Sequence, residues 1–345
     1  MAVRLPTALI EDDPVVLAPE AGLAFVSDQD DGWTRRKCGR GFTYLDEDGG
    51  TLRGRRRRRL ESLAIPPAWR EVWLCPNESG YLQATGVDDA ERKQYRYHPD
   101  YVSLMERRKY QRLAHFPRAL AGIRRAISED LRQPAGSRRC ATATAVALID
   151  RHLLRVGNES SAEDGHFGVT TLLPAHLRTS TSSGEPVAEL DYRAKSGQRR
   201  RVEVDPDLAD DLADLRARST DRLVWYSDDP DSGEDGRPRP LTAAMLNDYV
   251  RTHAGKGFST KDFRTWGGSV VALGARIDGA GEVEAVDAAA EALGNTRAVA
   301  RSSYVHPRVL AAGDDELRSA WTSSRTSEFR SRCEGALAKL IAPHR

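Results

Sequence analysis

Long hydrophobic runs and paired cysteines are both absent from this sequence. No apolar stretch approaches the roughly 20 residues that a membrane-spanning helix needs. The N-terminus carries Glu11, Asp12 and Asp13 in place of the basic and then apolar pattern of a secretory signal. The four cysteines lie far apart, without a C-x-x-C pair, so neither a disulfide framework nor a zinc site is indicated. We therefore expect a cytoplasmic protein with reduced thiols and no membrane segment.

The chain also has almost no net charge, only +1 at pH 7. This balance argues against a uniformly basic nucleic-acid binder. Charge is instead gathered in patches, each of which is either a solvated face or part of a surface that folding assembles. The basic patches are Arg53 with Arg55–Arg59, Arg107–Lys109 with Arg112, and Arg199–Arg201, and the acidic one is Asp228, Asp229, Asp231, Glu234 and Asp235.

The length of 345 residues favours two domains. Residues 39–98 largely alternate with a period of two, which predicts a small antiparallel sheet. Its strand 94–98 places Tyr95 and Tyr97 on one face. After residue 100 the period becomes helical. We expect an α+β protein with a small N-terminal antiparallel β-sheet domain at 1–100 and a larger, mainly α-helical domain at 101–345.

The second domain is predicted to hold one clear β element. This is a hairpin in which Leu190 and Tyr192 lead into a turn at Lys195–Gly197, and Val202 and Val204 return. The acidic segment 227–239 is expected to be an exposed loop. The predicted helices are 103–128, 137–156, 240–253, 260–276, 282–293 and 315–340.

Two basic residues at the ends of predicted elements are candidates for chemistry. Arg155 lies at the end of an apolar helix that we expect Gly157 to cap, and alone it would be a helix-terminal arginine. Lys195 lies at the hairpin tip, where lysines are usually only solubilising. Neither signal is specific by itself.

A third basic residue, Arg264, lies in a helix with a predicted cap at Ser259–Thr260. Lys261 precedes it by three positions and shares its face. Phe263 and Trp266 flank the arginine, so we expect a buried or half-buried guanidinium rather than the exposed base of a plain amphipathic helix.

Asn295 and Tyr304 complete the candidate set. Gly294 is expected to stop one helix and Thr296 to cap the next, with Tyr304 near that helix's end. Singly, they would be a turn residue and a half-buried aromatic. Jointly with two arginines and a lysine, a phenol of pKa near ~10 becomes a usable nucleophile, because arginine forks hold phosphate oxygens and a lysine can protonate a leaving group.

Four motifs carry a family resemblance. They are L-R-V-G-N-E at 154–159, A-K-S-G at 194–197, K-D-F-R-T-W at 261–266, and L-G-N-T followed by S-Y-V-H-P within 293–307. Their order resembles that of bacterial, poxvirus-like type IB DNA topoisomerases. The segments I-P-P-A-W at 65–69, L-Q-A-T-G at 82–86 and R-K-Q-Y-R-Y-H at 92–98 are also similar to that family, so the resemblance covers about 35–310.

The resemblance implies that Tyr304 attacks the scissile phosphate and forms a 3′-phosphotyrosyl enzyme and a free 5′-hydroxyl. It also implies that Arg155 and Arg264 hold the non-bridging oxygens and that Asn295 donates a hydrogen bond to one of them. Viral relatives and tyrosine recombinases usually have histidine where Asn295 stands. An amide cannot shuttle protons at neutral pH, which favours oxyanion stabilisation for Asn295.

The same resemblance implies that Lys195 is the general acid, with Lys261 as a nearby cation or second donor. It further implies that the N-terminal domain clamps DNA, with Gln94, Tyr95 and Tyr97 contacting the major groove. The substrate would be double-stranded DNA, held by a monomer associated with the nucleoid.

The sequence has no Walker motif and no carboxylate cluster suited to two Mg²⁺ ions, so no nucleotide, metal or other cofactor is expected. One alternative is a tyrosine site-specific recombinase, although its His-x-x-Arg signature differs from Lys261-Asp-Phe-Arg264 and its N-terminal domain is normally helical. Another is a non-catalytic DNA-binding clamp, which would not require Tyr304.

Overall fold

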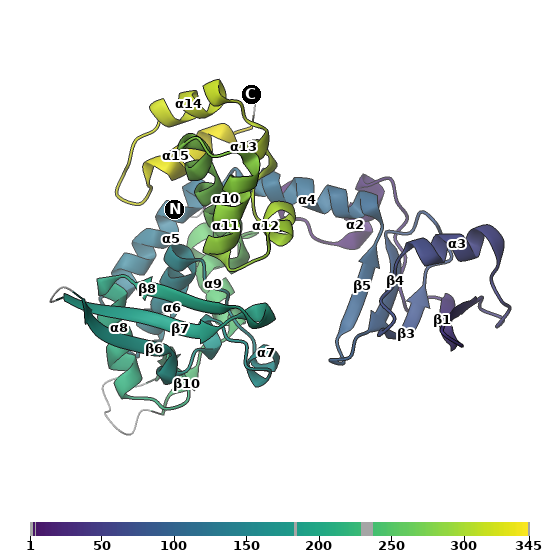
Figure 1. Cartoon of the computed structure of the whole chain (residues 1–345), viewed down its shortest axis with the longest axis horizontal. Coiled ribbons are helices and arrows are strands. Elements are labelled where there is room, and N and C mark those ends of the chain that lie inside the picture. Colours follow the sequence, from purple (N-terminus) through teal and green to yellow (C-terminus); the bar gives the residue numbers. More distant parts are fainter. Residues whose placement is uncertain (1–2, 4, 183–184, 229–236, 344–345) are drawn as a thin grey trace. The chain divides into compact units, whose positions relative to one another are not determined.

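The chain forms two structural units in the computed structural model, which describes residues 3, 5–182, 185–228 and 237–343. The smaller unit is Thr7–Tyr110, and the larger one is Met1–Pro6 with Gln111–Arg345. The division falls inside helix α4, Pro99–Leu113 (Figure 1). The expected α+β class is confirmed, since an antiparallel sheet lies in the smaller unit and helices dominate the larger.

The smaller unit is built on a five-stranded sheet with the strand order β2-β1-β3-β4-β5, all neighbours antiparallel. The strands are β1 Trp33–Cys38, β2 Gly41–Leu45, β3 Arg70–Leu74, β4 Leu82–Val87 and β5 Lys93–Tyr97. Strand β1 begins ahead of the predicted start of the sheet. Three helices of this unit were not predicted: α1 Thr7–Ile10, α2 Pro14–Glu20 and α3 Gly54–Ser62.

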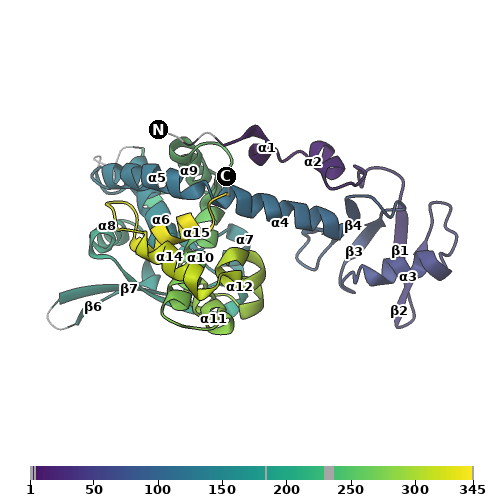
Figure 2. The same cartoon turned by 90° about the horizontal axis from the view of Figure 1, so that it is seen from above.

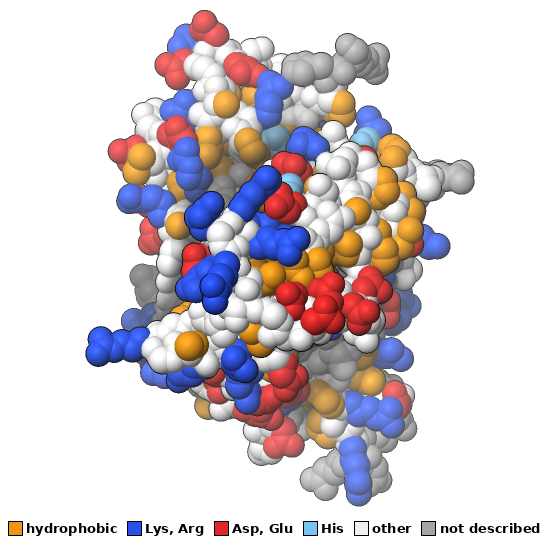
Figure 3. All heavy atoms as spheres, turned by 90° about the vertical axis from the view of Figure 1, so that its right-hand side faces the viewer, with side chains coloured by type: hydrophobic (Ala, Val, Ile, Leu, Met, Phe, Trp, Pro, Cys, Tyr) orange, Lys and Arg blue, Asp and Glu red, His pale blue; other side chains and the backbone are white. Residues whose placement is uncertain are grey.

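Helix α3 contains most of the first basic patch. Arginine is a good helix former, and the helix needs only Leu60, which is fully buried, to pack on Trp33, Val72 and Leu74 of the sheet. Arg55–Arg58 are exposed, whereas Arg59 is half-buried and donates to the Cys75 carbonyl at 2.6 Å and the Pro76 carbonyl at 3.0 Å. Figure 3, which faces the smaller unit, shows Lys and Arg side chains gathered near the centre of that view, beside hydrophobic and acidic ones.

The larger unit is mainly helical. Its α-helices are α5 Phe116–Asp130, α6 Arg138–His152, α7 Glu159–Glu163, α8 Pro206–Ala217, α9 Ala243–Ala254, α10 Thr260–Ile277, α11 Glu282–Leu293, α12 Arg297–Ser303, α13 Pro307–Ala311, α14 Asp314–Thr322 and α15 Arg332–Leu340. Short 3₁₀ helices are η1 Val169–Thr171, η2 Pro174–His176 and η3 Lys195–Gly197. In both Figure 1 and Figure 2, α10, α11 and α12 lie side by side.

The predicted hairpin is present as β7 Glu185–Arg193 and β8 Arg199–Val204, with Leu190 opposite Val202. It is not the whole β content of this unit, because β6 Leu177–Ser182 extends it to three strands and β9 Trp225–Tyr226 pairs with β10 Arg239–Pro240. Of the acidic patch, Asp229, Asp231, Glu234 and Asp235 lie outside the described residues.

Three predicted helix boundaries were wrong. The stretch 103–128 is two helices, because α4 ends at Leu113 and a new helix, α5, begins after His115 with Pro117 in its first turn, where proline is well tolerated. The stretch 315–340 is likewise split into α14 and α15. Helix α6 ends at His152 rather than near Gly157, since Leu153 takes the left-handed conformation with φ 54°. Arg155 therefore lies after the helix end, in a segment without regular secondary structure.

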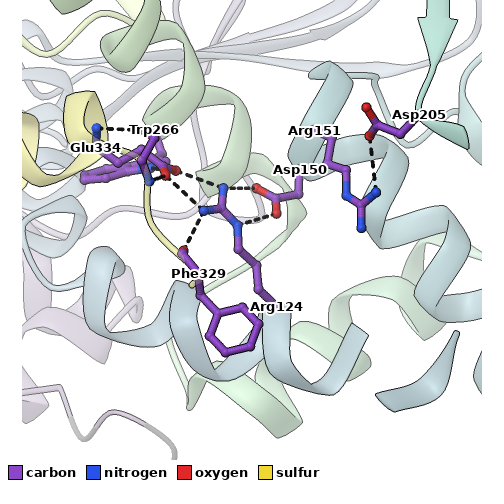
Figure 4. A network of polar contacts seen from close by, with 8 residues as sticks. Arg124, Asp150, Arg151, Asp205, Trp266, Phe329 and Glu334 are labelled. Carbon is purple, nitrogen blue, oxygen red and sulfur yellow. Dashed lines mark hydrogen bonds and ion pairs between the residues drawn. The ribbon is translucent and has the colours of Figure 1, made fainter. Parts of the chain in front are cut away.

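Helix α10 is held in the larger unit by a buried ion-pair network (Figure 4). The Arg124 guanidinium on α5 donates to Asp150 on α6 at 2.7 and 2.9 Å. It also donates to Glu334 on α15 at 2.8 and 3.0 Å and to the Phe329 carbonyl at 2.8 Å. Glu334 in turn accepts from Trp266 Nε1 on α10 at 3.0 Å. Three helices thus meet at the Arg124 guanidinium, and Glu334 joins α10 to them as the fourth.

No helix in the described part of the chain is both long and apolar enough to cross a membrane.

Candidate active site

Four of the five predicted catalytic residues come together where the carboxyl ends of α6 and α11 meet α10. Arg155 donates through Nη2 to Asn295 Oδ1. The Arg264 guanidinium carbon lies 5.2 Å from the centre of the Tyr304 ring. These residues come from segments as far apart as 155 and 304, so the tertiary fold alone brings them together.

Arg264 is buried, with 5% of its surface exposed, as its aromatic neighbours predicted. Its fork binds two helix ends: Nη1 donates to the Leu153 carbonyl after α6, and Nη2 donates to the Leu293 carbonyl of α11 at 2.8 Å. These carbonyls lack partners inside their own helices and carry partial negative charge. The arginine therefore fixes the two helix ends from which Arg155 and Asn295 extend.

The loop that carries Asn295 has the local structure that the sequence predicted. Gly294 caps α11 in the left-handed conformation with φ 58°, and Asn295 N donates to the Ala290 carbonyl at 2.9 Å. Thr296 caps α12, its side chain accepting from Val299 N at 3.4 Å. This turn aims the Asn295 side chain at Arg155.

Two glycines let α10 approach these helix ends closely. A Cβ on Gly267 would lie 2.2 Å from Leu153 Cδ2. A Cβ on Gly268 would lie 2.8 Å from Leu293 Cδ1 and 3.4 Å from Tyr304 Cβ. Side chains at these two positions would therefore hold α10 away from both helix ends.

Tyr304 caps the C-terminus of α12 and is 8% exposed. Its backbone is fixed to α10, because Ser269 Oγ donates to the Tyr304 carbonyl at 3.0 Å and accepts from His306 N at 2.9 Å. Its ring packs with Leu153, Leu293 and the aliphatic residues of α11 and α12. The phenol is therefore held in one place by both backbone and ring contacts.

Opposing effects act on the phenol. Burial raises the pKa of Tyr304, but the positive charges and hydrogen bonds of Arg264 and Arg155 outweigh it and leave that pKa below its usual value. Burial, and then the positive charge of Arg155, lower the pKa of Arg264 to about 10. The site thus stabilises the phenolate form of Tyr304 relative to that of an exposed tyrosine, and it does so by placing two guanidinium groups close together.

Buried donors without partners also lie in this cluster. Asn295 Nδ2 and Arg264 Nε are buried and have no hydrogen-bond partner among the described residues. An unpaired buried donor costs free energy unless a ligand satisfies it. Donors and guanidinium groups around a phenol suit an anion with several oxygen atoms, such as a phosphodiester.

Lys195 is not joined to the other four. It is exposed in η3 at the hairpin tip, and none of the hydrogen bonds or ion pairs recorded for the described residues links it to them. The structure places it on the same unit as the cluster but does not bring its ammonium into contact.

The predicted DNA-contact residues lie on both units. Lys261 is exposed in the first turn of α10. In the smaller unit, Tyr95 and Tyr97 are 47% and 39% exposed, and their rings stack at 5.9 Å on one face of β5. Gln94 is partly buried and donates to Asp88 Oδ2 at 2.9 Å. The two tyrosines therefore offer a flat surface for further stacking.

Sequence reasoning missed Arg200, which it counted only as part of a basic patch. Arg200 faces inward from β8 and binds backbone carbonyls of both helix ends. The sequence could have indicated this, because alternate residues of a strand lie on one face and Arg200 therefore shares a face with Val202 and Val204.

Comparison with known proteins agrees with this geometry. Residues 99–323, more than half of the chain, match the family model of the catalytic core of eukaryotic DNA topoisomerase I, and residues 41–88 match that of the N-terminal domain of bacterial DNA topoisomerase IB. The chain belongs to the type IB DNA topoisomerases. It is 28% identical over 291 residues to a protein named DNA topoisomerase 1B from Acanthamoeba polyphaga mimivirus, covering 80% of this chain and 85% of the viral one.

Proposed function

We propose that this enzyme relaxes supercoiled duplex DNA by cutting one strand through Tyr304 and resealing it, with neither ATP nor a metal ion. One observation carries the proposal: a buried phenol with a lowered pKa lies against two guanidinium groups and an unpaired amide donor. This arrangement matches the charge that develops when a phosphodiester is attacked.

In the cutting step, Tyr304 Oη forms a bond to phosphorus as the bond from phosphorus to the 5′ oxygen breaks. The phenolic proton is lost to solvent, which the lowered pKa of Tyr304 favours. Arg155 and Arg264 hold the non-bridging oxygens, and Asn295 Nδ2 donates to one of them. The product is a 3′-phosphotyrosyl enzyme.

The leaving 5′ oxygen needs a proton, which we assign to Lys195. A hairpin tip is a suitable place for this group, because an exposed ammonium can reach a DNA strand lying over the site. Lys261, exposed on α10, adds a second cation. Resealing is the same step in reverse, and the phosphotyrosyl bond conserves the energy of the broken strand, so no nucleotide is required.

Double-stranded DNA is the proposed partner of both units, with one copy of the chain sufficient to act. In the smaller unit, the exposed tyrosines of β5 would contact bases, with Gln94 beside them. Neighbouring arginines would bind phosphates, which position the duplex without reading its sequence.

The test is relaxation of a supercoiled plasmid in EDTA without nucleotide. We expect the wild-type protein to relax any plasmid and to form a covalent adduct trapped by detergent. Tyr304→Phe should abolish both while retaining DNA affinity. A protein that acted only on paired specific sites would instead be a recombinase.

A matched control is Tyr249→Phe, which removes another phenol of the larger unit, one that donates to Asp130 at 3.0 Å. It should keep relaxation activity. Relaxation by Tyr304→Phe, or a strict need for Mg²⁺ or ATP in the wild type, would reject the proposal.

A further inference from the structure

The hairpin that carries Lys195 is a fixed loop whose position depends on its two strands. The Ala194 amide donates to the Gln198 carbonyl at 2.7 Å, and the Gly197 amide donates to the Ala194 carbonyl at 3.1 Å. Strand β8 then begins at Arg199. Whatever holds β7 and β8 therefore also sets the position of the Lys195 backbone.

Arg200, one residue into β8, ties the hairpin to the ends of two helices. Its Nη1 donates to the Glu291 carbonyl at 2.8 Å, and its Nη2 donates to the Ala292 carbonyl at 2.9 Å and to the His152 carbonyl at 3.4 Å. The first two carbonyls belong to the last turn of α11 and the third to the last residue of α6. A planar fork can bind three acceptors on two helices, whereas the single nitrogen of a lysine cannot reproduce that geometry.

The arginines on either side of Arg200 turn the other way. Arg199 and Arg201 lie 2.6 and 3.6 Å from Asp191, and their side chains are more than half exposed. Arg200 also packs tightly, because a Cβ on Gly294 would lie 2.9 Å from its Cδ. The inward contact is therefore specific to one of three successive arginines.

The same two helix ends lead into Arg155 and Asn295, and Arg264 joins them independently of the hairpin. The ends of α6 and α11 are thus joined to each other by Arg264, whether or not the hairpin is attached. Arg200 adds the attachment of the hairpin to these helix ends. We infer that Arg200 is a positioning residue that aligns the Lys195 hairpin with the scissile phosphate. This inference rests on the proposed function, in which Lys195 protonates the leaving oxygen.

The experiment uses single-turnover cleavage by the full chain of a duplex that contains a site mapped with the wild-type enzyme. The scissile phosphate carries either the ordinary 5′ oxygen or a 5′ sulfur, which leaves as a thiolate and needs no proton. We expect Arg200→Ala to slow cleavage of the oxygen substrate about 100-fold, the size of a misplacement of about 1 Å. The sulfur substrate should be cleaved at close to the wild-type rate.

Two further variants sharpen the result. In the Lys195→Ala background, Arg200→Ala should slow cleavage little further, because a positioned group that is already absent cannot be misplaced. Arg200→Lys keeps the charge and should still show the defect and its rescue by sulfur, so a folding failure of the alanine variant would not decide the matter. Arg201→Ala is the matched control and should cleave both substrates normally.

The outcomes separate the two proposals. If sulfur rescues Lys195→Ala but not the Arg200 variants, or if the two defects multiply, Arg200 does not align the hairpin and only this inference falls. If sulfur fails to rescue Lys195→Ala, the general-acid assignment falls, and the inference about Arg200 falls with it.

Discussion

At the scale of single residues, Tyr304 is a buried phenol beside two guanidinium groups. Burial in an apolar cluster would keep its phenol neutral, yet Arg264 and Arg155 favour the charged form strongly enough to lower its pKa. A bound phosphodiester would partly neutralise the two arginines and weaken this effect. The lowered pKa is therefore a property of the free enzyme, where it can be measured directly.

We predict that Tyr304 ionises below the ordinary tyrosine range in the free protein. The measurement is the tyrosinate absorbance of the wild type minus that of Tyr304→Phe as pH rises. Arg155→Ala removes one positive charge beside the phenol, so the pKa should move upward and ionisation should require a higher pH. Arg155→Lys keeps the charge and should move it less. An unchanged titration in Arg155→Ala would show that this guanidinium does not stabilise the phenolate.

At the scale of elements, the site depends on how closely α10 packs on the ends of α6 and α11. Gly267 faces Leu153, whose carbonyl binds Arg264, so the distance between α10 and the end of α6 also sets the position of that guanidinium. Close packing and catalytic geometry are coupled here through a single residue that has no side chain.

Gly267→Ala should therefore destabilise the protein by about 1–3 kcal/mol, the usual cost of overpacking, and should slow cleavage by displacing α10. Chemical denaturation and single-turnover cleavage measure the two effects. The matched control is Gly274→Ala in the same helix, where a Cβ would meet only Cys333 Sγ at an ordinary 3.8 Å. That change should stabilise the helix by about 1 kcal/mol. Equal stability of the two variants would contradict the packing argument.

Local signals predicted these elements well where capping residues and periodicity agreed. Helix α11 was predicted at its observed bounds, and Gly294 and Thr296 end and begin helices as expected. The end of α6 could not be predicted from the sequence, because Leu153 adopts a left-handed backbone conformation, which is unfavourable for leucine. In the folded chain, this residue packs against Gly267 of α10. Helix α3 was also not predicted, since five successive arginines suggest only a charged patch. Leu60 is the one buried residue of this helix, so the sequence has no apolar periodicity there.

The same limit applies to the candidate site. Motifs named Arg155, Arg264, Asn295 and Tyr304, and the structure brings these four together. The inward contact of Arg200 depends on three backbone carbonyls, which have no sequence signature of their own. Side-chain identity predicts which groups can do chemistry, while main-chain acceptors that orient them become visible only in the folded chain.

At the scale of the whole molecule, the segment beyond the core family match supports the helix that carries Arg264. The match ends at residue 323, whereas Glu334 lies in α15 and binds both Arg124 and Trp266. Burial raises the pKa of Glu334, but hydrogen bonds and charge from Arg124 outweigh this and hold that pKa below its usual value. The ionised carboxylate is thus the form that stabilises the fold.

We predict that Glu334→Gln lowers the free energy of unfolding by about 3 kcal/mol at pH 7, as expected for breaking a buried ion pair. Because the folded pKa is depressed, this contribution is fully present above the unfolded value near about 4.3 and is lost as pH falls through the folded pKa. The difference between wild type and variant should therefore shrink below about pH 4 in urea denaturation. Glu316→Gln, which breaks a more exposed pair with Arg308, should cost less than about 1 kcal/mol.

The network in Figure 4 also has a consequence for protein synthesis, because its partners lie far apart in the sequence. Arg124 precedes Glu334 by 210 positions, so a growing chain on the ribosome contains Arg155, Arg264 and Tyr304 before the carboxylate that joins Arg124 to Trp266 has been synthesised. Helix α10, which carries Arg264, thus acquires this support only after all the residues of the proposed DNA-cutting centre have been synthesised.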